Sequence, residues 1–378
     1  MVDLRAQLVA TRHEIEAAVG AVLDRGAFVR GPFVAAFEAE LAAYVGGLGA
    51  GAEVHALGVG NGTDALQIGL MALGVGPGDE VVCPAFTFVA TAEAAALLGA
   101  TPVFVDVDPD TFNLDADAVA DAITERTKAV VPVHLFGQCA DMSALRPVCE
   151  ATGVPVLEDM AQAAGATWEG VPAGALGDLA ALSFYPSKNL GAFGDGGAIL
   201  TTDAGLAERV RQIANHGAAK KYHHTAVGVN SRLDAIQAAI LSVHLRHLPV
   251  WTEARRTAAA AYDGLLADVE GLVLPVRRSE ARHVFHQYTV RIPGAHRDAV
   301  RDDLRARGVP TMVYYPEPLH RMGPYAADVD LPETDRACAE VLSLPMHPHL
   351  TLAQLRFVAD ALRQSVAARR PLAVAAGA

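Results

Sequence analysis

The chain has 378 residues, 52% of them apolar, and a formal net charge of −13. The apolar content excludes a disordered chain, and the acidic balance argues against a general nucleic-acid binder because phosphate contacts need a basic surface. We expect no membrane span and no signal peptide, since the chain shows neither a long apolar run nor a basic-then-apolar start. The length suggests two domains. The spacing of the four cysteines is neither paired nor metal-like, which indicates reduced thiols in a cytoplasmic protein without a metal site: Cys83, Cys139, Cys149 and Cys338.

In chain order, the pattern first predicts an amphipathic arm helix over Val9–Leu23. From residue 54 to about 216, short β-rich runs alternate with helical stretches, which is typical of an α/β fold with a mainly parallel sheet covered on both faces. The predicted strands are Val54–Val59, Glu80–Cys83, Pro102–Val105, Ala129–Val133, Val154–Leu157, Leu179–Phe184 and Ala198–Thr201. The predicted helices are Thr63–Leu73, Thr91–Leu98, Asp115–Ile123, Met142–Thr152 and Leu206–Ile213.

A long helix is predicted over Leu233–Leu245, and Pro249 is predicted to stop it. We place the domain boundary there, which gives a large domain of residues 1–248 and a smaller C-terminal α+β domain of residues 249–378. The predicted elements of the second domain are a strand Gln287–Ile292, a helix Asp298–Arg307, a strand Thr311–Tyr314 and a last helix opened by the capping box Thr351–Gln354. We expect residues 371–378 to be frayed.

Ligands of such sheets gather beyond the carboxyl ends of the strands, so we expect the functional residues in the turns that follow the strands. The turn Gly58–Ala65 leads into a helix with free backbone N–H groups, which suits an anion. The alternative is that Thr63 or Asp64 only caps the helix. After the second strand, Phe86 or Phe88 could stack on a flat heteroaromatic ring or pack in the core.

Two further turns carry ionisable groups. The fifth strand ends in Glu158 and Asp159, and a carboxylate there could pair with a protonated ring nitrogen or cap a helix. The sixth predicted strand is followed by Lys188, which is one of only four lysines in the chain and lies within an apolar and glycine-rich run. Loss of hydration beside Phe184 and Phe193 should lower the pKa of this lysine and leave a neutral amine, a nucleophile for aldehydes. The alternative is a lysine that extends from a strand end to solvent.

These groups together match what proteins contribute to pyridoxal phosphate chemistry: a phosphate cradle, a stacking ring, an acid for the ring nitrogen and an amine.

A separate feature is the segment from Arg209 to Arg232, which is rich in basic residues and histidines and contains no acidic residue. It is either a solvated loop or a binding site for a compact polyanion such as a nucleotide diphosphate.

Several segments in a fixed order resemble the DegT/DnrJ/EryC1/StrS family, whose members are fold-type-I, pyridoxal-phosphate-dependent aminotransferases of nucleotide-linked keto sugars. The similarity covers nearly the whole chain. The resemblance implies a seven-stranded sheet in the large domain and an L-glutamate donor that becomes 2-oxoglutarate. The segments are Gly60–Leu66, Glu158–Gln162, Ser183–Gly191, Gly194–Gly197 and Asn230–Asp234.

The resemblance also implies the cofactor site. Lys188 would form the Schiff base, Asp159 would bind the pyridinium nitrogen, and Gln162 would approach the ring hydroxyl. Met160 stands where alanine is common and would crowd the cofactor slightly. The remaining cofactor contacts would be Phe88 on the ring and Gly62, Thr63 and Ser183 on the phosphate, with Asn230 reaching that phosphate from the other subunit of an obligate homodimer.

A branch of the family dehydrates sugars and has histidine in place of the lysine, so Lys188 favours transamination. The segments Lys221–His224, Val227–Arg232 and Ser183–Pro186 resemble enzymes that aminate a 3-keto group rather than a 4-keto group. The candidate substrates are UDP-linked 3-keto-N-acetylglucosaminuronate and dTDP-linked 3-keto-6-deoxyhexoses. The alternatives are a 4-keto aminotransferase and a sensor that binds the cofactor without catalysis.

Four residues are predicted to bind the sugar nucleotide. Arg232 would bind the carboxylate of a uronate, and Lys221 belongs to the basic stretch that would hold the diphosphate. Tyr314 and Tyr315 would contact the sugar or the cofactor, or would only pack.

Overall fold

The computed structural model describes residues 1–294 and 296–369. The predicted frayed end, residues 371–378, lies outside the described residues. The α-helices are α1 (Leu4–Arg25), α2 (Pro32–Gly47), α3 (Gly62–Leu73), α4 (Ala90–Leu97), α5 (Ala116–Ala122), α6 (Met142–Thr152), α7 (Ala204–Ile213), α8 (Ala235–Leu266), α9 (Arg297–Ala306), α10 (Pro332–Glu340) and α11 (Leu352–Ala367). The strands are β1 (His55–Val59), β2 (Glu80–Pro84), β3 (Thr101–Val105), β4 (Thr127–Val130), β5 (Leu157–Asp159), β6 (Thr167–Trp168), β7 (Val171–Pro172), β8 (Leu179–Ser183), β9 (Gly197–Thr201), β10 (Ala218–Lys220), β11 (His223–His224), β12 (Ala281–Arg282), β13 (Tyr288–Arg291) and β14 (Val341–Leu344).

The central sheet has the strand order β1-β9-β8-β5-β4-β2-β3. β5 and β8 are parallel, as are β2 and β3, and β2 and β4. Parallel bridges from Val130 to Val156 and from Val133 to Asp159 join β4 to β5. β9 runs antiparallel to both its neighbours. Each predicted strand of this sheet overlaps an observed one, so the predicted mainly parallel α/β fold is confirmed.

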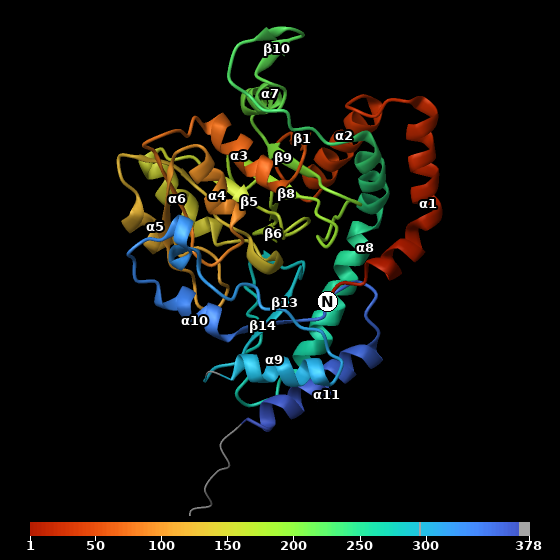
Figure 1. The fold of residues 1–378 in the computed structure, drawn as a ribbon, viewed down its shortest axis with the longest axis vertical. Coiled ribbons are helices and arrows are strands. Elements are labelled where there is room, and N and C mark those ends of the chain that lie inside the picture. The colour runs from red at the N-terminus through yellow and green to blue at the C-terminus, as the bar shows by residue number, and fades with distance from the viewer. Residues whose placement is uncertain (295, 370–378) are drawn as a thin grey trace, which may run out of the picture.

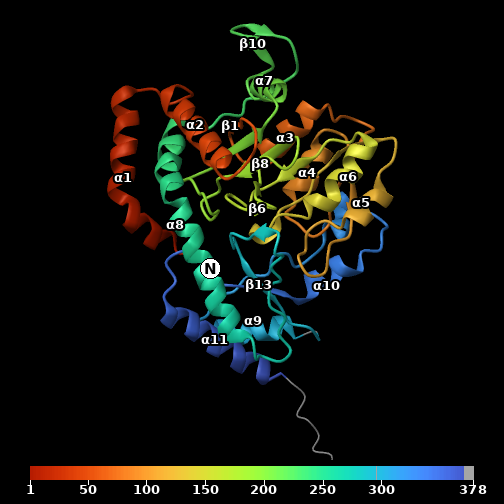
Figure 2. The same cartoon turned by 180° about the vertical axis from the view of Figure 1, so that it is seen from behind.

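Helices cover both faces of the sheet, because successive side chains of each strand point to opposite faces. On β8, Leu179 and Ala181 pack with α3, α4 and α7, whereas Ala180 and Leu182 pack with α2, α5 and α6. The views from both sides show the resulting three layers (Figures 1 and 2). The carboxyl ends of the parallel strands therefore share one edge.

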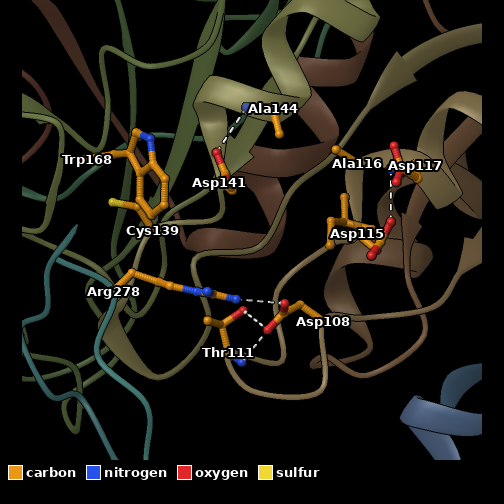
Figure 3. A pocket seen from close by; sticks show the side chains of 11 residues that line it. Asp108, Thr111, Asp115, Ala116, Asp117, Cys139, Asp141, Ala144, Trp168 and Arg278 are labelled. Atoms are coloured by element: carbon orange, nitrogen blue, oxygen red, sulfur yellow. Dashed lines mark hydrogen bonds and ion pairs between the residues drawn. The ribbon is translucent and has the colours of Figure 1, made fainter. Parts of the chain in front are cut away.

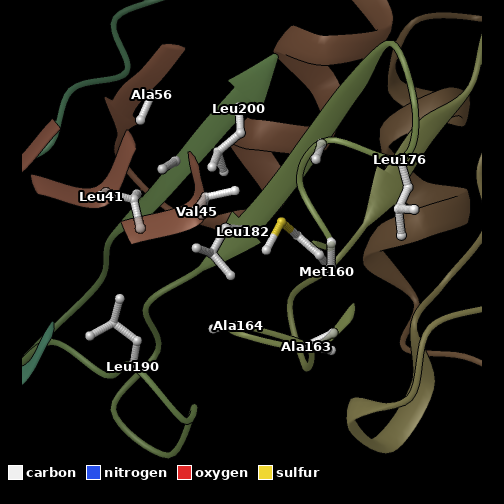
Figure 4. Packing of buried hydrophobic residues seen from close by; sticks show 14 of the residues in the cluster. Leu41, Val45, Ala56, Met160, Ala163, Ala164, Leu176, Leu182, Leu190 and Leu200 are labelled. Atoms are coloured by element: carbon white, nitrogen blue, oxygen red, sulfur yellow. The ribbon is translucent and has the colours of Figure 1, made fainter. Parts of the chain in front are cut away.

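Met160 lies in the core on the α2 side of the sheet, close to Val45, Leu182 and Leu200 (Figure 4). Its side chain is only 1% exposed. The expectation that Met160 crowds a cofactor is therefore wrong. Gly174, with a φ of 101°, makes room for it, since a Cβ there would lie 3.2 Å from the Met160 sulfur.

The long helix α8 continues through Pro249, so the predicted stop is wrong. Proline removes one helical hydrogen bond, but Pro249 lies on the exposed side of the helix, where water can satisfy the freed carbonyl. Leu248 and Trp251 are buried and hold the helix in place on the other side. The helix runs from α1 and α2 to α11 (Figures 1 and 2). The boundary between residues 248 and 249 falls inside it and stays a prediction.

The C-terminal part has its own core, in which β13 pairs antiparallel with β14 and packs with α9, α11 and the end of α8. The predicted strand Thr311–Tyr314 is wrong: this segment forms a single bridge, between Met312 and Ser343. Its aromatic end turns away to pack with Phe86 in a separate cluster. The capping box is confirmed, since the Gln354 N–H and side chain both bond to Thr351.

Among the described residues, no helix combines the length and apolar character that a membrane span requires. All four cysteines are buried and unpaired.

Candidate active site

The turn from β1 into α3 forms one wall of the candidate site. The Oδ1 atom of Asn61 accepts a hydrogen bond of 2.8 Å from the Asp64 N–H and so caps α3. Within the part of the chain that the structure describes, no hydrogen bond uses the N–H groups of Gly62 and Thr63. Gly62 lies against Ser183 at the end of β8, because a Cβ on Gly62 would come within 2.6 Å of the Ser183 Cβ. Two free N–H groups, a helix N-terminus and a hydroxyl therefore meet, which suits a phosphate.

Asp159 ends β5, which pairs with β8 in the sheet. It is 5% exposed, and its two oxygens accept hydrogen bonds from the Thr91 hydroxyl at 2.8 Å and the Ala161 N–H at 3.2 Å. Burial raises the pKa of Asp159, while these two bonds and the nearby Lys188 and His134 lower it. The bonds support the carboxylate form and fix its orientation.

Lys188 lies in the turn after β8, which is closed by a hydrogen bond of 2.8 Å from its N–H to the Tyr185 carbonyl. Its side chain is half-buried, and no hydrogen bond or ion pair engages its amine within residues 1–294 and 296–369. Burial lowers the pKa of Lys188, as expected, and Asp159 opposes that shift. The structure thus brings Lys188 and Asp159 close enough for each to shift the pKa of the other.

Gln162 joins two walls of the site. Its Oε1 accepts a hydrogen bond of 2.7 Å from the Phe136 N–H, and its Nε2 donates one of 3.2 Å to the Tyr315 hydroxyl. The Tyr315 ring lies 6.3 Å from that of Phe88, which is 56% exposed. Phe86 is buried in the core instead. Of the two phenylalanines, Phe88 is therefore the one available to stack on a ligand.

Tyr314 lies beside Tyr315, with ring centroids 5.9 Å apart. Burial, and then the neighbouring Tyr185, raise the pKa of Tyr314. Tyr185 is 56% exposed and is the first residue of the Lys188 turn. These tyrosines bring the segment after Thr311 close to the Lys188 turn.

Several neighbours of these groups could not be predicted from the sequence. Thr91 holds Asp159, and the buried His286 lies near Lys188, with its Nδ1 3.3 Å from the Asn189 Oδ1. Burial, and then the charge of Lys188, hold the pKa of His286 well below its usual range. No sequence pattern links these residues to the site, because each comes from a separate element.

Three predicted residues lie outside this cluster of contacts. Lys221 lies at the tip of the β10–β11 hairpin, which projects beyond α7 (Figures 1 and 2), and its ammonium is 5.2 Å from the Tyr222 ring. Asn230 is exposed and forms a single bridge with Asn215. Arg232 lines a separate cavity together with Arg30 and Arg211.

A cavity of about 190 Å³ lies beside α5 and α6 and contains four aspartates (Figure 3). Asp115 and Asp141 cap the two helices, and Asp108 pairs with Arg278 at 2.9 Å. Three of the four carboxylates therefore already have structural partners. Among the described residues, no group of His, Cys, Asp and Glu side chains could hold a metal ion.

The cluster fits the three functional groups of pyridoxal phosphate. The Gly62–Ser183 approach leaves room and donors for a phosphate, the Asp159 carboxylate suits a protonated ring nitrogen, and the unpaired Lys188 amine suits an aldehyde.

The sequence pattern of the DegT/DnrJ/EryC1/StrS aminotransferase family matches residues 9–363. A Geobacillus stearothermophilus relative named pleiotropic regulatory protein is 48% identical over 370 residues, which are 96% of this chain and 97% of the relative. The UDP-2-acetamido-2-deoxy-3-oxo-D-glucuronate aminotransferase of Pseudomonas aeruginosa is 47% identical over 363 residues, which are 96% of this chain and 98% of that enzyme. The solved structure of DesV from S. venezuelae in complex with a ketimine intermediate has a TM-score of 0.92 and 45% identity, and the match covers 98% of each chain.

Proposed function

The chain belongs to the DegT/DnrJ/EryC1/StrS aminotransferase family and is an aminotransferase, and we propose that it uses pyridoxal phosphate to move the amino group of L-glutamate to C3 of a nucleotide-linked 3-keto sugar. The observation that supports this most directly is the unpaired amine of Lys188 beside the buried carboxylate of Asp159. A binding protein has no need for a desolvated nucleophile and an oriented acid in one site.

Pyridoxal phosphate, when bound, supplies an aldehyde that amines attack and a ring that withdraws electrons. Asp159 would hold the proton on the ring nitrogen, and Thr91 would keep the carboxylate aligned for this. The backbone N–H groups of Gly62 and Thr63 would bind the phosphate together with the Ser183 hydroxyl. Lys188 would first hold the aldehyde carbon and, once displaced by the substrate amine, carry a proton at Nζ to and from the substrate carbon.

The lowered pKa of Lys188 supports this second role, because a base must lose its proton near neutral pH. Gln162, held by Phe136 and Tyr315, would face the ring hydroxyl. Phe88 would cover the ring and exclude water from one side. L-glutamate would leave as 2-oxoglutarate.

The sugar carries its keto group at C3 in this proposal. The Pseudomonas aeruginosa relative is named for a 3-oxo nucleotide sugar, and this chain matches it over nearly its whole length. We take the UDP-linked 3-keto uronate as the first candidate and the dTDP-linked 3-keto-6-deoxyhexose as the second. Tyr315 bonds to Gln162, and Tyr314 lies near Tyr185 of the Lys188 turn, so both tyrosines would contact the sugar.

The working form in this proposal is a cytoplasmic homodimer. The β10–β11 hairpin, which carries Lys221, projects beyond α7 (Figure 1), and Asn230 is exposed. In the homodimer, each copy would bring these residues to its partner's site. The four unpaired thiols suit a reducing compartment.

The name of the Geobacillus stearothermophilus relative raises a second function, that of a regulator. A regulator without catalysis would tolerate the loss of Lys188 or Asp159, and this chain has both. Turnover in vitro separates the two functions.

The test begins with the cofactor. The purified protein, supplied with pyridoxal phosphate, is expected to show a visible absorption band, and borohydride should link the cofactor to the peptide that contains Lys188, as read by mass spectrometry. Lys188→Ala should lose this label, whereas the control Lys128→Ala, at an exposed position of β4, should keep it. A wild-type protein without the band and label would refute the proposal. A panel of 3-amino and 4-amino nucleotide sugars, assayed in reverse with 2-oxoglutarate, then identifies the aminated carbon.

A further inference from the structure

His286 is a buried histidine to which the proposed mechanism gives no role. It precedes β13 and is 5% exposed, and its Nδ1 lies 3.3 Å from the Oδ1 of Asn189, the residue that follows Lys188. Its Nε2 lies 3.5 Å from the amide nitrogen of Gln287. A site that only needs to be filled favours an apolar side chain, because buried ring nitrogens are unfavourable without hydrogen-bond partners. The polar contacts of His286 therefore indicate a role beyond packing.

The hydrogen-bond partners of His286 assign the proton on its ring. The amide nitrogen of Asn189 donates a hydrogen bond of 3.2 Å to the Val284 carbonyl, so the Oδ1 of Asn189 is the atom that faces the histidine. This oxygen can only accept, and the Nδ1 of His286 is therefore the donor. Nε2 faces the amide nitrogen of Gln287, which can only donate, so Nε2 carries no proton. The contacts thus support a neutral imidazole.

Two cationic groups reinforce the neutral form of this histidine. Lys188 approaches it from the turn after β8. Arg255 approaches it from α8, and its guanidinium donates a hydrogen bond of 3.3 Å to the Phe285 carbonyl, next to the histidine in the chain. Burial, followed by the charges of Lys188 and Arg255, holds the pKa of His286 well below its usual range. Lys188, whose own charge is favoured by Asp159, is therefore the member of this pair that takes up a proton first.

Asn189 connects His286 to the turn that carries Lys188. Within this turn, the Lys188 N–H donates a hydrogen bond of 2.8 Å to the Tyr185 carbonyl. The side chain of Asn189 is 5% exposed and leads out of the turn, to the segment between β12 and β13. The contact with His286 therefore fixes the turn, and the lysine in it, against that segment.

The segment around His286 is itself fixed against the site. The residue after His286 donates a backbone hydrogen bond of 3.3 Å to the Phe136 carbonyl, and the Phe136 N–H donates one of 2.7 Å to Gln162. Gly137 lies directly against the histidine, because a Cβ on Gly137 would come within 2.9 Å of the His286 backbone nitrogen. His286 is therefore held by close packing, and it links the Lys188 turn to the residues that hold Gln162.

We propose that His286 is a positioning residue for Lys188, which it holds through Asn189 so that the amine points at the cofactor aldehyde. A neutral Nδ1–H donor serves this purpose without adding a positive charge beside the amine. The position of a nucleophile matters steeply, since a displacement of about 1 Å can lower a rate about 100-fold. This role rests on the proposed function, in which Lys188 attacks an aldehyde.

The test measures how fast pyridoxal phosphate becomes linked to Lys188 in the full-length protein, by borohydride trapping at timed intervals and mass spectrometry of the Lys188 peptide. His286→Leu is expected to slow the link at least about tenfold, because the amine loses its orientation. His286→Asn should restore most of the rate, since an asparagine amide nitrogen takes the place of Nδ1. Asn189→Ala should slow the link as much as His286→Leu, and the double variant should be no slower than either single variant.

Acetic anhydride separates orientation from chemical reactivity, because it reacts with any neutral amine that it can reach. Acetylation of Lys188 in the cofactor-free protein, measured relative to the exposed Lys128, should not fall in His286→Leu. In wild type, the acetylation rate should follow a single titration curve with pH, that of the Lys188 amine, because the low pKa of His286 keeps this histidine neutral.

His283→Leu is the matched control. His283 lies in the same segment, is also 5% exposed and stacks on Phe285 with ring centroids 3.8 Å apart. In the part of the chain that the structure describes, no hydrogen bond joins His283 to Asn189. This change should lower the Tm but leave the link to Lys188 at the wild-type rate. If His286→Leu does not fold, Asn189→Ala carries the same test.

Three results would overturn the inference. One is a wild-type rate of linkage in both His286→Leu and Asn189→Ala. Another is an equal slowing in His283→Leu, which would make the effect one of general packing. The third is an acetylation rate that falls in parallel with the linkage, or a second inflection near pH 6.5, the usual pKa of histidine, that His286→Asn removes. A wild-type protein that never forms the link would instead refute the proposed function, whereas its acetylation curve would be unaffected.

Discussion

Glu158 and Asp159 are neighbours in β5, but their carboxylates face opposite sides of the strand and serve different partners. Glu158 is 0% exposed and accepts hydrogen bonds from the N–H groups of Gly174, Leu176 and Gly177 and from His134. Asp159 faces Thr91 and Lys188 instead. The first carboxylate therefore holds the turn after β7 in place, and the second is available for chemistry.

Glu158→Gln should lower the free energy of unfolding by about 3 kcal/mol, because the amide nitrogen cannot accept the buried hydrogen bonds that the carboxylate receives from the backbone N–H groups and from His134. Urea unfolding measures the loss. Glu150→Gln is the control, since Glu150 pairs with Arg146 on the surface and its side chain is 64% exposed. A loss no larger than that of the control would show that the buried contacts of Glu158 contribute little.

Asp159→Asn should lower turnover at least about 100-fold, because the amide cannot hold a proton on the ring nitrogen. Stability should change by less than about 1 kcal/mol, since burial already disfavours the charged form of Asp159. Steady-state rates and urea unfolding check the two expectations. Asp141→Asn, in the cap of α6, serves as the control with normal turnover. Wild-type rates for Asp159→Asn would leave Asp159 without a catalytic role.

Gly62→Ala should weaken cofactor binding and cost about 1–3 kcal/mol of stability, because the new Cβ would lie 2.6 Å from the Ser183 Cβ and 3.2 Å from its Cα. A cofactor titration and urea unfolding measure both effects. Gly46→Ala is the control, because its Cβ would meet no atom within 4 Å. That change should be neutral or slightly stabilising in a helix. Normal affinity in Gly62→Ala would exclude a tight phosphate cradle.

Lys188→Met should make the cofactor-free protein more stable than wild type at pH 7, by about 1 kcal/mol. Burial lowers the pKa of Lys188 in the folded state more than the attraction of Asp159 raises it. Folding therefore disfavours the protonated form of the amine. Wild-type stability should therefore rise as the pH passes from the lowered pKa toward about 10.4, the value of a free lysine, and the advantage of methionine should shrink there. Urea unfolding at pH 7 and pH 10 checks the sign. A less stable variant at pH 7 would show that Asp159 outweighs burial.

The sequence by itself determined the sheet, because short β-rich runs that alternate with helical stretches are typical of strands covered by helices on both faces. It also singled out Lys188 and Asp159, which follow strand ends and carry groups that are rare in apolar surroundings. Local pattern failed at Pro249, where the packing of Leu248 and Trp251 on the buried side of α8 overrides one lost hydrogen bond. It failed again at Thr311–Tyr314, where the packing of the aromatic end of this segment with Phe86 takes the chain away from the sheet.

Only the tertiary structure decided which residues complete the site. The hydrogen bond from Gln162 to Tyr315 spans 153 positions, that from Thr91 to Asp159 spans 68, and that from His286 to Asn189 spans 97. Periodicity within a segment carries no information on such pairs, since their distance depends on how strands and helices pack against each other. The chemical groups could therefore be read from the sequence, and their partners could not.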